Sequence, residues 1–222
     1  MKKLLKIVTF FAACSVLLLA TAQRGDNLRL DGKEYGIYTN PLEPFLQENP
    51  GKLPKSDVIS TGLWRGYVAT WEVKDRMLLL VDVQILHSEK KPGESGFSTE
   101  FKSVMAQMFP ENKAVAARWF SGNIIVPDGK LVNYVHMGYA STYEKYILLR
   151  IENGAVIRQW TTDASGFIKF RDAQFAAYKK TEEFRKALAE TAKEGSMSPK
   201  ENEEFLRQYY SERYMSMIFD NQ

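Results

Sequence analysis

Two apolar stretches separated by three polar residues form the clearest pattern along the chain. In the first, residues 62–73, apolar side chains alternate with other types, and the second, residues 77–86, is almost continuously apolar. Alternation with a period of two is typical of a β-strand that buries one face. The polar Lys74-Asp75-Arg76 between the stretches therefore predicts a hairpin.

The length of the loop decides the register of this hairpin. A three-residue loop pairs Val73 with Met77 and gives one face only apolar side chains, whereas a two-residue loop sets Ala69 against Asp82. Since a shift of one residue turns every side chain of a strand to the opposite face, we predict the three-residue loop. The cross-strand pairs expected on the core face are Val73–Met77, Trp71–Leu79, Ala69–Val81 and Tyr67–Val83.

Turn signals mark further strands in the first 170 residues. Asp31-Gly32 and Asn153-Gly154 are dipeptides that accept positive φ angles, and each predicts a tight hairpin turn. Pro127-Asp128-Gly129 predicts another turn. The strands expected after the first hairpin are residues 115–120, 123–126, 131–138, 143–151 and 155–161.

Helical spacing replaces alternation in the last third of the chain. Apolar residues recur at helical intervals over residues 171–193, and Ser198-Pro199-Lys200-Glu201 predicts a capping box for a helix that reaches about residue 217. Two shorter helices are expected, one capped by Asn40 with Pro41 at its first position and one over residues 101–108.

This order of elements indicates an α+β fold. We predict a curved or barrel-like antiparallel sheet followed by two C-terminal helices. The sheet belongs to a β-rich domain, residues 23–170, and residues 171–222 form a helical pair packed on the same domain. Whether these helices cover their own sheet or swap onto a second copy stays open.

The first 22 residues have the composition of a secretory signal peptide. Lys2, Lys3 and Lys6 precede an apolar run over residues 7–19, and Ala20-Thr21-Ala22 supplies small residues for cleavage. The run is short for the roughly 20 residues of a membrane-spanning helix. We therefore predict an exported protein, periplasmic or extracellular, without a transmembrane span once the signal is removed.

Loss of this segment changes the charge and the cysteine content. Removing its three lysines from the 30 basic residues leaves 27, equal to the 27 acidic residues, so nucleic acid is not expected as a partner. Cys14, the single cysteine, leaves with the signal, and the mature chain is cysteine-free. Disulfides, thiolate zinc sites and thiol nucleophiles are thereby excluded.

Aromatic and arginine side chains are the candidates for binding, because tryptophan, tyrosine and arginine dominate binding hot spots. Trp64 and Arg65 lie near the start of a strand, where packing demands are low. Arg65 has an alternative within the fold, as the partner of a carboxylate or of an aromatic ring. The predicted ligand-binding residues are Trp64, Arg65, Trp119 and Tyr139, and the first three are expected to be exposed.

Motifs for catalysis are few. The two histidines, His87 and His136, lack metal-binding spacing, and neither a nucleophile elbow nor a phosphate-binding loop is found, so no metal or cofactor is expected. We predict a non-catalytic binding or interaction protein whose partner is a protein or a small ligand. The alternative is a hydrolase of an envelope or extracellular polymer that uses Glu72 and Asp82, or His136.

Three short segments carry a resemblance to other proteins. They are Trp-Arg-Gly-Tyr at residues 64–67, Thr-Trp-Glu at residues 70–72 and Trp-Phe-Ser-Gly at residues 119–122. Together they resemble a group of small, uncharacterised bacterial exported proteins over residues 30–156. The resemblance implies one β-rich unit and carries no activity.

Overall fold

The computed structural model describes residues 23–89, 98–111, 113–134, 141–193 and 197–219. The predicted signal peptide with Cys14 lies outside these residues. So do Tyr139 and His136, whose predicted roles the structure does not address.

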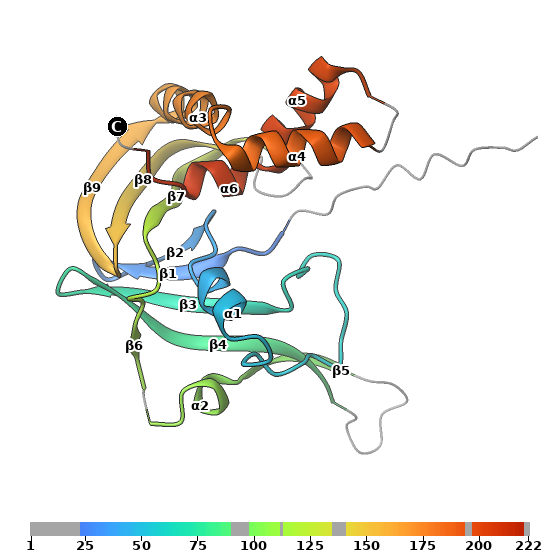
Figure 1. Cartoon of the computed structure of the whole chain (residues 1–222). Helices are drawn as coiled ribbons and strands as arrows, with labels where there is room; N and C mark the ends of the chain where they lie inside the picture. The colour runs from blue at the N-terminus through green and yellow to red at the C-terminus, as the bar shows by residue number, and fades with distance from the viewer. Residues whose placement is uncertain (1–22, 90–97, 112, 135–140, 194–196, 220–222) are drawn as a thin grey trace, which may run out of the picture.

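The strands form one nine-stranded sheet in the order β2-β1-β3-β4-β9-β8-β7, with β5 and β6 also paired to β4 (Figure 1). Every pairing among the described strands is antiparallel except that of β1 with β3, so the sheet is mixed and not purely antiparallel as predicted. The strands are β1 (Asp26–Leu30), β2 (Lys33–Ile37), β3 (Tyr67–Lys74), β4 (Met77–Glu89), β5 (Ser98–Ser103), β6 (Val115–Ala116), β7 (Gly122–Asn133), β8 (Thr142–Glu152) and β9 (Ala155–Asp163).

The two halves of the sheet meet at two places. On one side, β4 pairs with β9 only through Met77 and Ala155. On the other, the backbone N–H of Tyr38, just after β2, donates to the carbonyl of Ile125 in β7 at 2.8 Å. Thr39 follows with hydrogen bonds to the β7 backbone. These contacts bring the ends of the sheet together, but the strand ladder is not closed.

The β3–β4 hairpin has a different register from the one predicted. Its loop is the two-residue Asp75-Arg76, with φ angles of 50° and 59°, and Trp71 pairs with Leu80. A β-bulge between Thr70 and Trp71 then adds one residue to β4, so Ala69 faces Val83. The bulge corrects the mismatch that a two-residue loop would otherwise create, and the predicted core face of β3 is kept. Tyr67, Ala69 and Trp71 are fully buried.

The turn predicted at Pro127-Asp128-Gly129 is absent, because β7 runs through it as one strand. The pairing with β8 shifts between Asp128 and Leu131, and Gly129 has a φ of 78°. Because β7 is the last strand in the sheet order, no strand ladder on its outer side needs the N–H group that Pro127 lacks. A β-bulge between Asp128 and Leu131 accommodates the additional residues of β7. The hairpin turns predicted at Asp31-Gly32 and Asn153-Gly154 are confirmed.

Within the described part of the chain, four helices, and not the two predicted, follow the sheet. The helices of the chain are α1 (Glu43–Glu48), α2 (Met105–Met108), α3 (Ala164–Tyr178), α4 (Glu182–Lys193), α5 (Pro199–Tyr209) and α6 (Ser211–Ser216). The single helix expected over residues 171–193 starts earlier, at Ala164, and is divided after Tyr178. There the Thr181 hydroxyl accepts from the N–H of Phe184 and caps α4. The capping box at Ser198 and Glu201 is confirmed, whereas the helix expected over residues 101–108 begins as strand β5.

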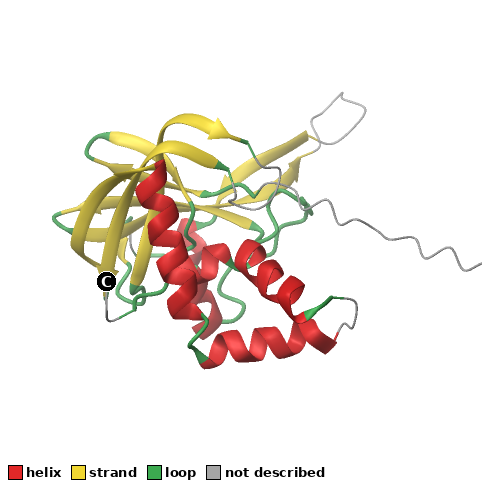
Figure 2. Ribbon diagram, turned by 90° about the horizontal axis from the view of Figure 1, so that it is seen from above, coloured by secondary structure: helices red, strands yellow, loops and turns green. Residues whose placement is uncertain are grey.

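These helices pack against the sheet of their own chain and gather beside its strands (Figure 2). Helix α3 lies against β8 and β9, and α6 lies against β7. Tyr146 of β8 stacks on Phe167 of α3 with ring centroids 3.7 Å apart, and Leu206 and Tyr214 are fully buried. A second core, around Trp71, Leu28 and Leu80, also contains buried residues of β7, β8 and β9, so it lies between the two halves of the sheet. The chain is therefore α+β with two apolar cores.

We expect Gly154→Ala to destabilise the fold by about 2 kcal/mol or more, as measured by chemical denaturation. Gly154 has a φ of 80°, and a Cβ atom there would lie 2.9 Å from the backbone carbonyl of Ala117. Backbone strain costs about 1–3 kcal/mol, and the clash adds to it. Gly32→Ala is the matched control, because Gly32 has a φ of 76° and open space around the added methyl group. Equal losses in the two variants would contradict the packing argument.

Candidate functional site

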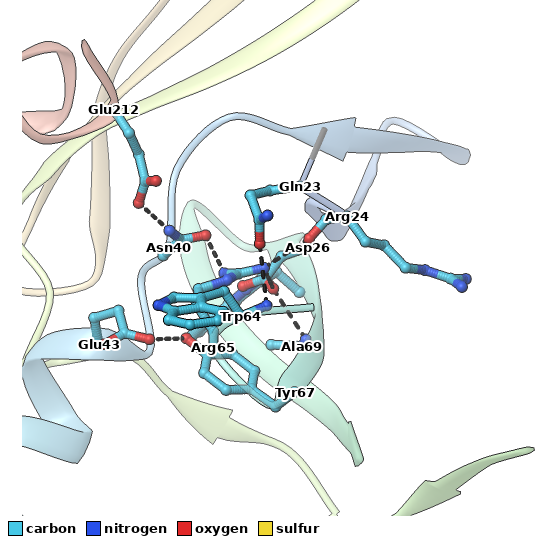
Figure 3. Close-up of polar contacts among 11 residues, drawn as sticks. Gln23, Arg24, Asp26, Asn40, Glu43, Trp64, Arg65, Tyr67, Ala69 and Glu212 are labelled. Atoms are coloured by element: carbon cyan, nitrogen blue, oxygen red, sulfur yellow. Dashed lines mark hydrogen bonds and ion pairs between the residues drawn. The ribbon is translucent and has the colours of Figure 1, made fainter. Parts of the chain in front are cut away.

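Trp64 lies on the loop between α1 and β3 and is 80% exposed. Its backbone is nevertheless held in place, since its N–H donates to Oε1 of Gln23 at 3.1 Å. Gln23 also donates through Nε2 to the carbonyl of Thr61, and the N–H of Arg24 donates to the carbonyl of Gly62. The predicted exposure of Trp64 is confirmed, on a loop fixed to the N-terminal segment (Figure 3).

Arg65, the next residue, points into the fold, so the prediction that it is exposed is wrong. Its Nη2 lies 3.2 Å from Oδ1 of Asp26, and its side chain is only 13% exposed. The guanidinium also donates to the carbonyl of Arg24 at 2.9 Å and stacks over the ring of Tyr67 at 5.0 Å. Arg65 therefore has both structural roles that the sequence offered as the alternative to ligand binding, an ion pair and a contact with an aromatic ring.

Asp26 is the fully buried partner at the centre of this cluster. Its carboxylate accepts from the backbone N–H of Ala69 at 3.1 Å and from the indole N–H of Trp71 at 3.0 Å. Burial raises the pKa of Asp26, and the Arg65 charge and these N–H donors oppose that rise. Because an arginine is always protonated, its charge favours the ionised form of Asp26, and the contact joins β1 to the loop before β3.

The cluster continues to the last helix. Asn40 accepts from Arg65 through its side-chain carbonyl and donates through its amide to Glu212 of α6 (Figure 3). The prediction that Asn40 caps α1 is wrong, because Leu42 occupies that position and the Asn40 side chain is engaged here. Burial, together with the nearby carboxylates of Glu43 and Asp26, raises the pKa of Glu212 to about 7, against the opposing effect of Arg65.

Glu43 of α1 and Tyr67 of β3 also belong to this cluster. The Tyr67 hydroxyl donates to Oε1 of Glu43 at 2.9 Å. Burial raises the pKa of Tyr67 well above its usual value, so its hydroxyl stays protonated and serves as a donor. We refer to Asp26, Asn40, Glu43, Arg65, Tyr67 and Glu212 as the Arg65 cluster.

Trp119 is half-buried and is not the exposed anchor predicted. Its ring lies 4.8 Å from that of Phe45 and stacks parallel to that of Phe109 at 6.4 Å. The indole N–H donates to the carbonyl of Pro41 at 2.9 Å. These contacts fasten α1 and the residue that ends α2 to the turn between β6 and β7, a structural role.

The two carboxylates considered for hydrolysis lie on β3 and β4. Glu72 pairs with Leu79, and Asp82 pairs with Thr70. Asp82 accepts from Ser103 at 2.6 Å and from Gln84 at 2.8 Å. Within the described residues, no group of three or more histidine, cysteine or acidic side chains is arranged to hold a metal ion. No helix in the same residues is long and apolar enough to cross a membrane.

Comparison with protein-family models, with curated proteins and with solved structures finds no match for this chain. The resemblance carried by the Trp-Arg-Gly-Tyr, Thr-Trp-Glu and Trp-Phe-Ser-Gly segments stays a prediction. The site residues that sequence reasoning missed are Asp26, Asn40, Glu43 and Glu212. They come from elements far apart in the chain, and no spacing signal connects them to Arg65.

We expect Arg65→Met to lower the free energy of unfolding by about 3–5 kcal/mol, because it leaves the buried Asp26 without a counter-charge. In Asp26→Asn/Arg65→Met, both charges are removed, and the loss should be smaller than the sum of the two single losses. Urea denaturation of the four proteins gives the coupling energy. Strictly additive losses would show that the ion pair does not support the fold.

Glu212 should make the protein less stable as the pH rises. The pKa is about 7 in the folded protein against a usual 4.5, so the folded state binds more protons between these values. Stability conferred by the protonated form is then lost as the pH rises from about 4.5 to 7, on the order of 1–3 kcal/mol.

Glu212→Gln imitates the protonated side chain and should remove this slope, with higher stability than the wild type at pH 8. Glu111→Gln, an exposed carboxylate, controls for the loss of one charge. Unfolding free energies at pH 5 and pH 8 provide the measurement. A slope unchanged in Glu212→Gln would show that Glu212 is not the titrating group.

Proposed function

We propose that the protein is an exported, non-catalytic binding protein and that Trp64 is the centre of its contact surface for a protein partner. The observation that carries the proposal is an indole ring 80% exposed on a loop whose backbone is fixed by Gln23 and Arg24. Large apolar side chains exposed in this way on a fixed frame are typical of binding hot spots.

Trp71 and Trp119 differ from Trp64 in their indole N–H groups. That of Trp71 donates to Asp26, and that of Trp119 donates to Pro41. Within the described residues, the indole N–H of Trp64 has no acceptor. Trp64 therefore offers both an apolar ring and a free donor to a partner, the combination that enriches tryptophan at interfaces.

The surroundings of Trp64 support a protein partner. Ile59, on the same loop, is 94% exposed, whereas Leu63 between them is buried and fixes the loop to the core. Arg65, immediately after Trp64, is locked by Asp26 and cannot swing out with it. A side chain presented by a rigid segment loses little conformational entropy on binding, so more of its contact energy appears as affinity.

The N-terminal sequence supports export. Residues 1–22 have the charge, apolar run and small-residue end of a signal peptide, and the partner is then a periplasmic or extracellular protein. We infer further that the curved sheet and its C-terminal helices serve as the rigid frame for this surface. The alternative hydrolase function stays a prediction, which an activity screen on glycans and peptidoglycan fragments tests.

Trp64→Ala should abolish partner binding while the melting temperature stays within a few degrees of the wild type, because exposed substitutions change stability by about 0.5 kcal/mol or less. The mature protein, residues 23–222, is immobilised and exposed to envelope extract and culture medium from cells that produce it. Tyr209→Ala is the matched control, since Tyr209 is 48% exposed on another surface, on α5.

A partner retained by the wild type and by Tyr209→Ala, but not by Trp64→Ala, would support the proposal. Retention of the same proteins by all three would contradict it. A large fall in the melting temperature of Trp64→Ala would make Trp64 part of the fold instead.

A further inference from the structure

A second candidate site lies away from Trp64, where β8, β9 and α3 meet the C-terminal segment. A cavity of about 230 Å³ opens there, and its walls include Arg150, Arg158, Trp160, Phe170 and Phe219. The volume is below the roughly 300–1,000 Å³ of pockets for drug-sized ligands, so a smaller molecule fits.

Two arginines face each other on the wall of this cavity. Arg150 of β8 and Arg158 of β9 are direct cross-strand partners. Like charges in directly opposite positions of a sheet destabilise it. Arg150 Nε lies 3.3 Å from Oε1 of Glu152, an ion pair without hydrogen-bond geometry at a half-exposed carboxylate. Glu152 therefore balances the guanidinium charge of Arg150.

Arg158 differs from Arg150, because no carboxylate of the described residues balances its charge. Within the described residues its guanidinium has no ion pair or hydrogen bond, and it rests over the ring of Trp160 at 4.7 Å. Stacking orients the planar guanidinium and leaves its N–H groups at the edge for an acceptor. A carboxylate matches the arrangement of these donors, because two parallel N–H groups bind its two oxygens.

The aromatic side chains of the cavity wall indicate which group is attached to the carboxylate of the ligand. Trp160 and Phe170 meet edge to face, with centroids 6.2 Å apart and planes at 70°. Both rings line the cavity together with Phe219. Flat apolar walls next to a cation fit a molecule that has an aromatic ring attached to an anionic group.

We propose that this cavity binds a small aromatic carboxylate, with the carboxylate on Arg158 and the ring against Trp160 and Phe170. The site is separate from the Trp64 surface, shares no residue with it, and stands or falls independently of the proposed partner protein.

Benzoate is the probe, and titration calorimetry on the purified chain is the measurement, with Trp fluorescence as a second signal from Trp160. Benzamide has the same ring and no charge, and acetate has the carboxylate and no ring. Benzoate should bind at least tenfold more tightly than either. Arg158→Gln should weaken benzoate binding at least tenfold and remove its advantage over benzamide. Arg118→Gln, an exposed arginine outside the cavity, should leave binding unchanged.

The melting temperature distinguishes a binding role of Arg158 from a structural one. Loss of the like-charge pair should leave the melting temperature of Arg158→Gln equal to or above that of the wild type. Absence of benzoate binding, equal binding of benzoate and benzamide, or benzoate binding unchanged in a folded Arg158→Gln would overturn the proposal. The proposal would also be overturned if Arg158→Gln had a lowered melting temperature and kept the preference of the wild type for benzoate over benzamide.

Discussion

The ion pair between Asp26 and Arg65 is the contact on which the rest of the architecture depends. Asp26 begins β1, and its fully buried carboxylate is placed among donors that all come from β3 or the loop before it. Strands β1 and β3 are parallel, and their connection contains β2, α1 and the loop that carries Trp64. Parallel strands cannot be joined by a tight turn, so a specific contact must fix how the connection returns. The buried carboxylate of Asp26 supplies this contact, because its donors meet it only when β3 returns beside β1.

A buried ion pair is weak evidence for net stability, because taking two charges out of water offsets most of their attraction. Its value here is specificity. Arg65 also donates to the side-chain oxygen of Asn40, and the Asn40 amide donates to Glu212 on α6 (Figure 3). The same small cluster thus fixes the parallel strand, the start of β3 and the last helix relative to one another. It connects the half of the sheet around Trp71 to the half covered by the C-terminal helices.

Sequence patterns predicted what depends on neighbours in the chain. The period-two pattern placed Tyr67, Ala69 and Trp71 in the core, and the capping box located the start of α5. The predicted hairpin register was wrong because a bulge in β4 allows a two-residue loop to occur together with an apolar face. The alternation of apolar residues alone does not show where a strand carries an extra residue. The Arg65 cluster was out of reach for a related reason. Its members lie in β1, β3, α1, α6 and two loops, and nothing in their local sequence indicates that they meet.

In this protein, the type of a residue does not show whether its side chain supports the fold or is a candidate for binding. The difference is whether the side chain has a hydrogen-bond or charge partner within the fold. Arg65 and Arg158 are the same amino acid and both stack on an aromatic ring. Arg65 has a buried carboxylate, and its charge is fully used within the fold. Arg158 instead is exposed, faces another arginine, and has no carboxylate partner among the described residues. The indole groups of Trp119 and Trp64 differ in the same way, since one has an acceptor in Pro41 and the other is presented to solvent. Arg158 and Trp64 are groups that the fold holds in place without using them, and such groups are where a binding role is to be sought.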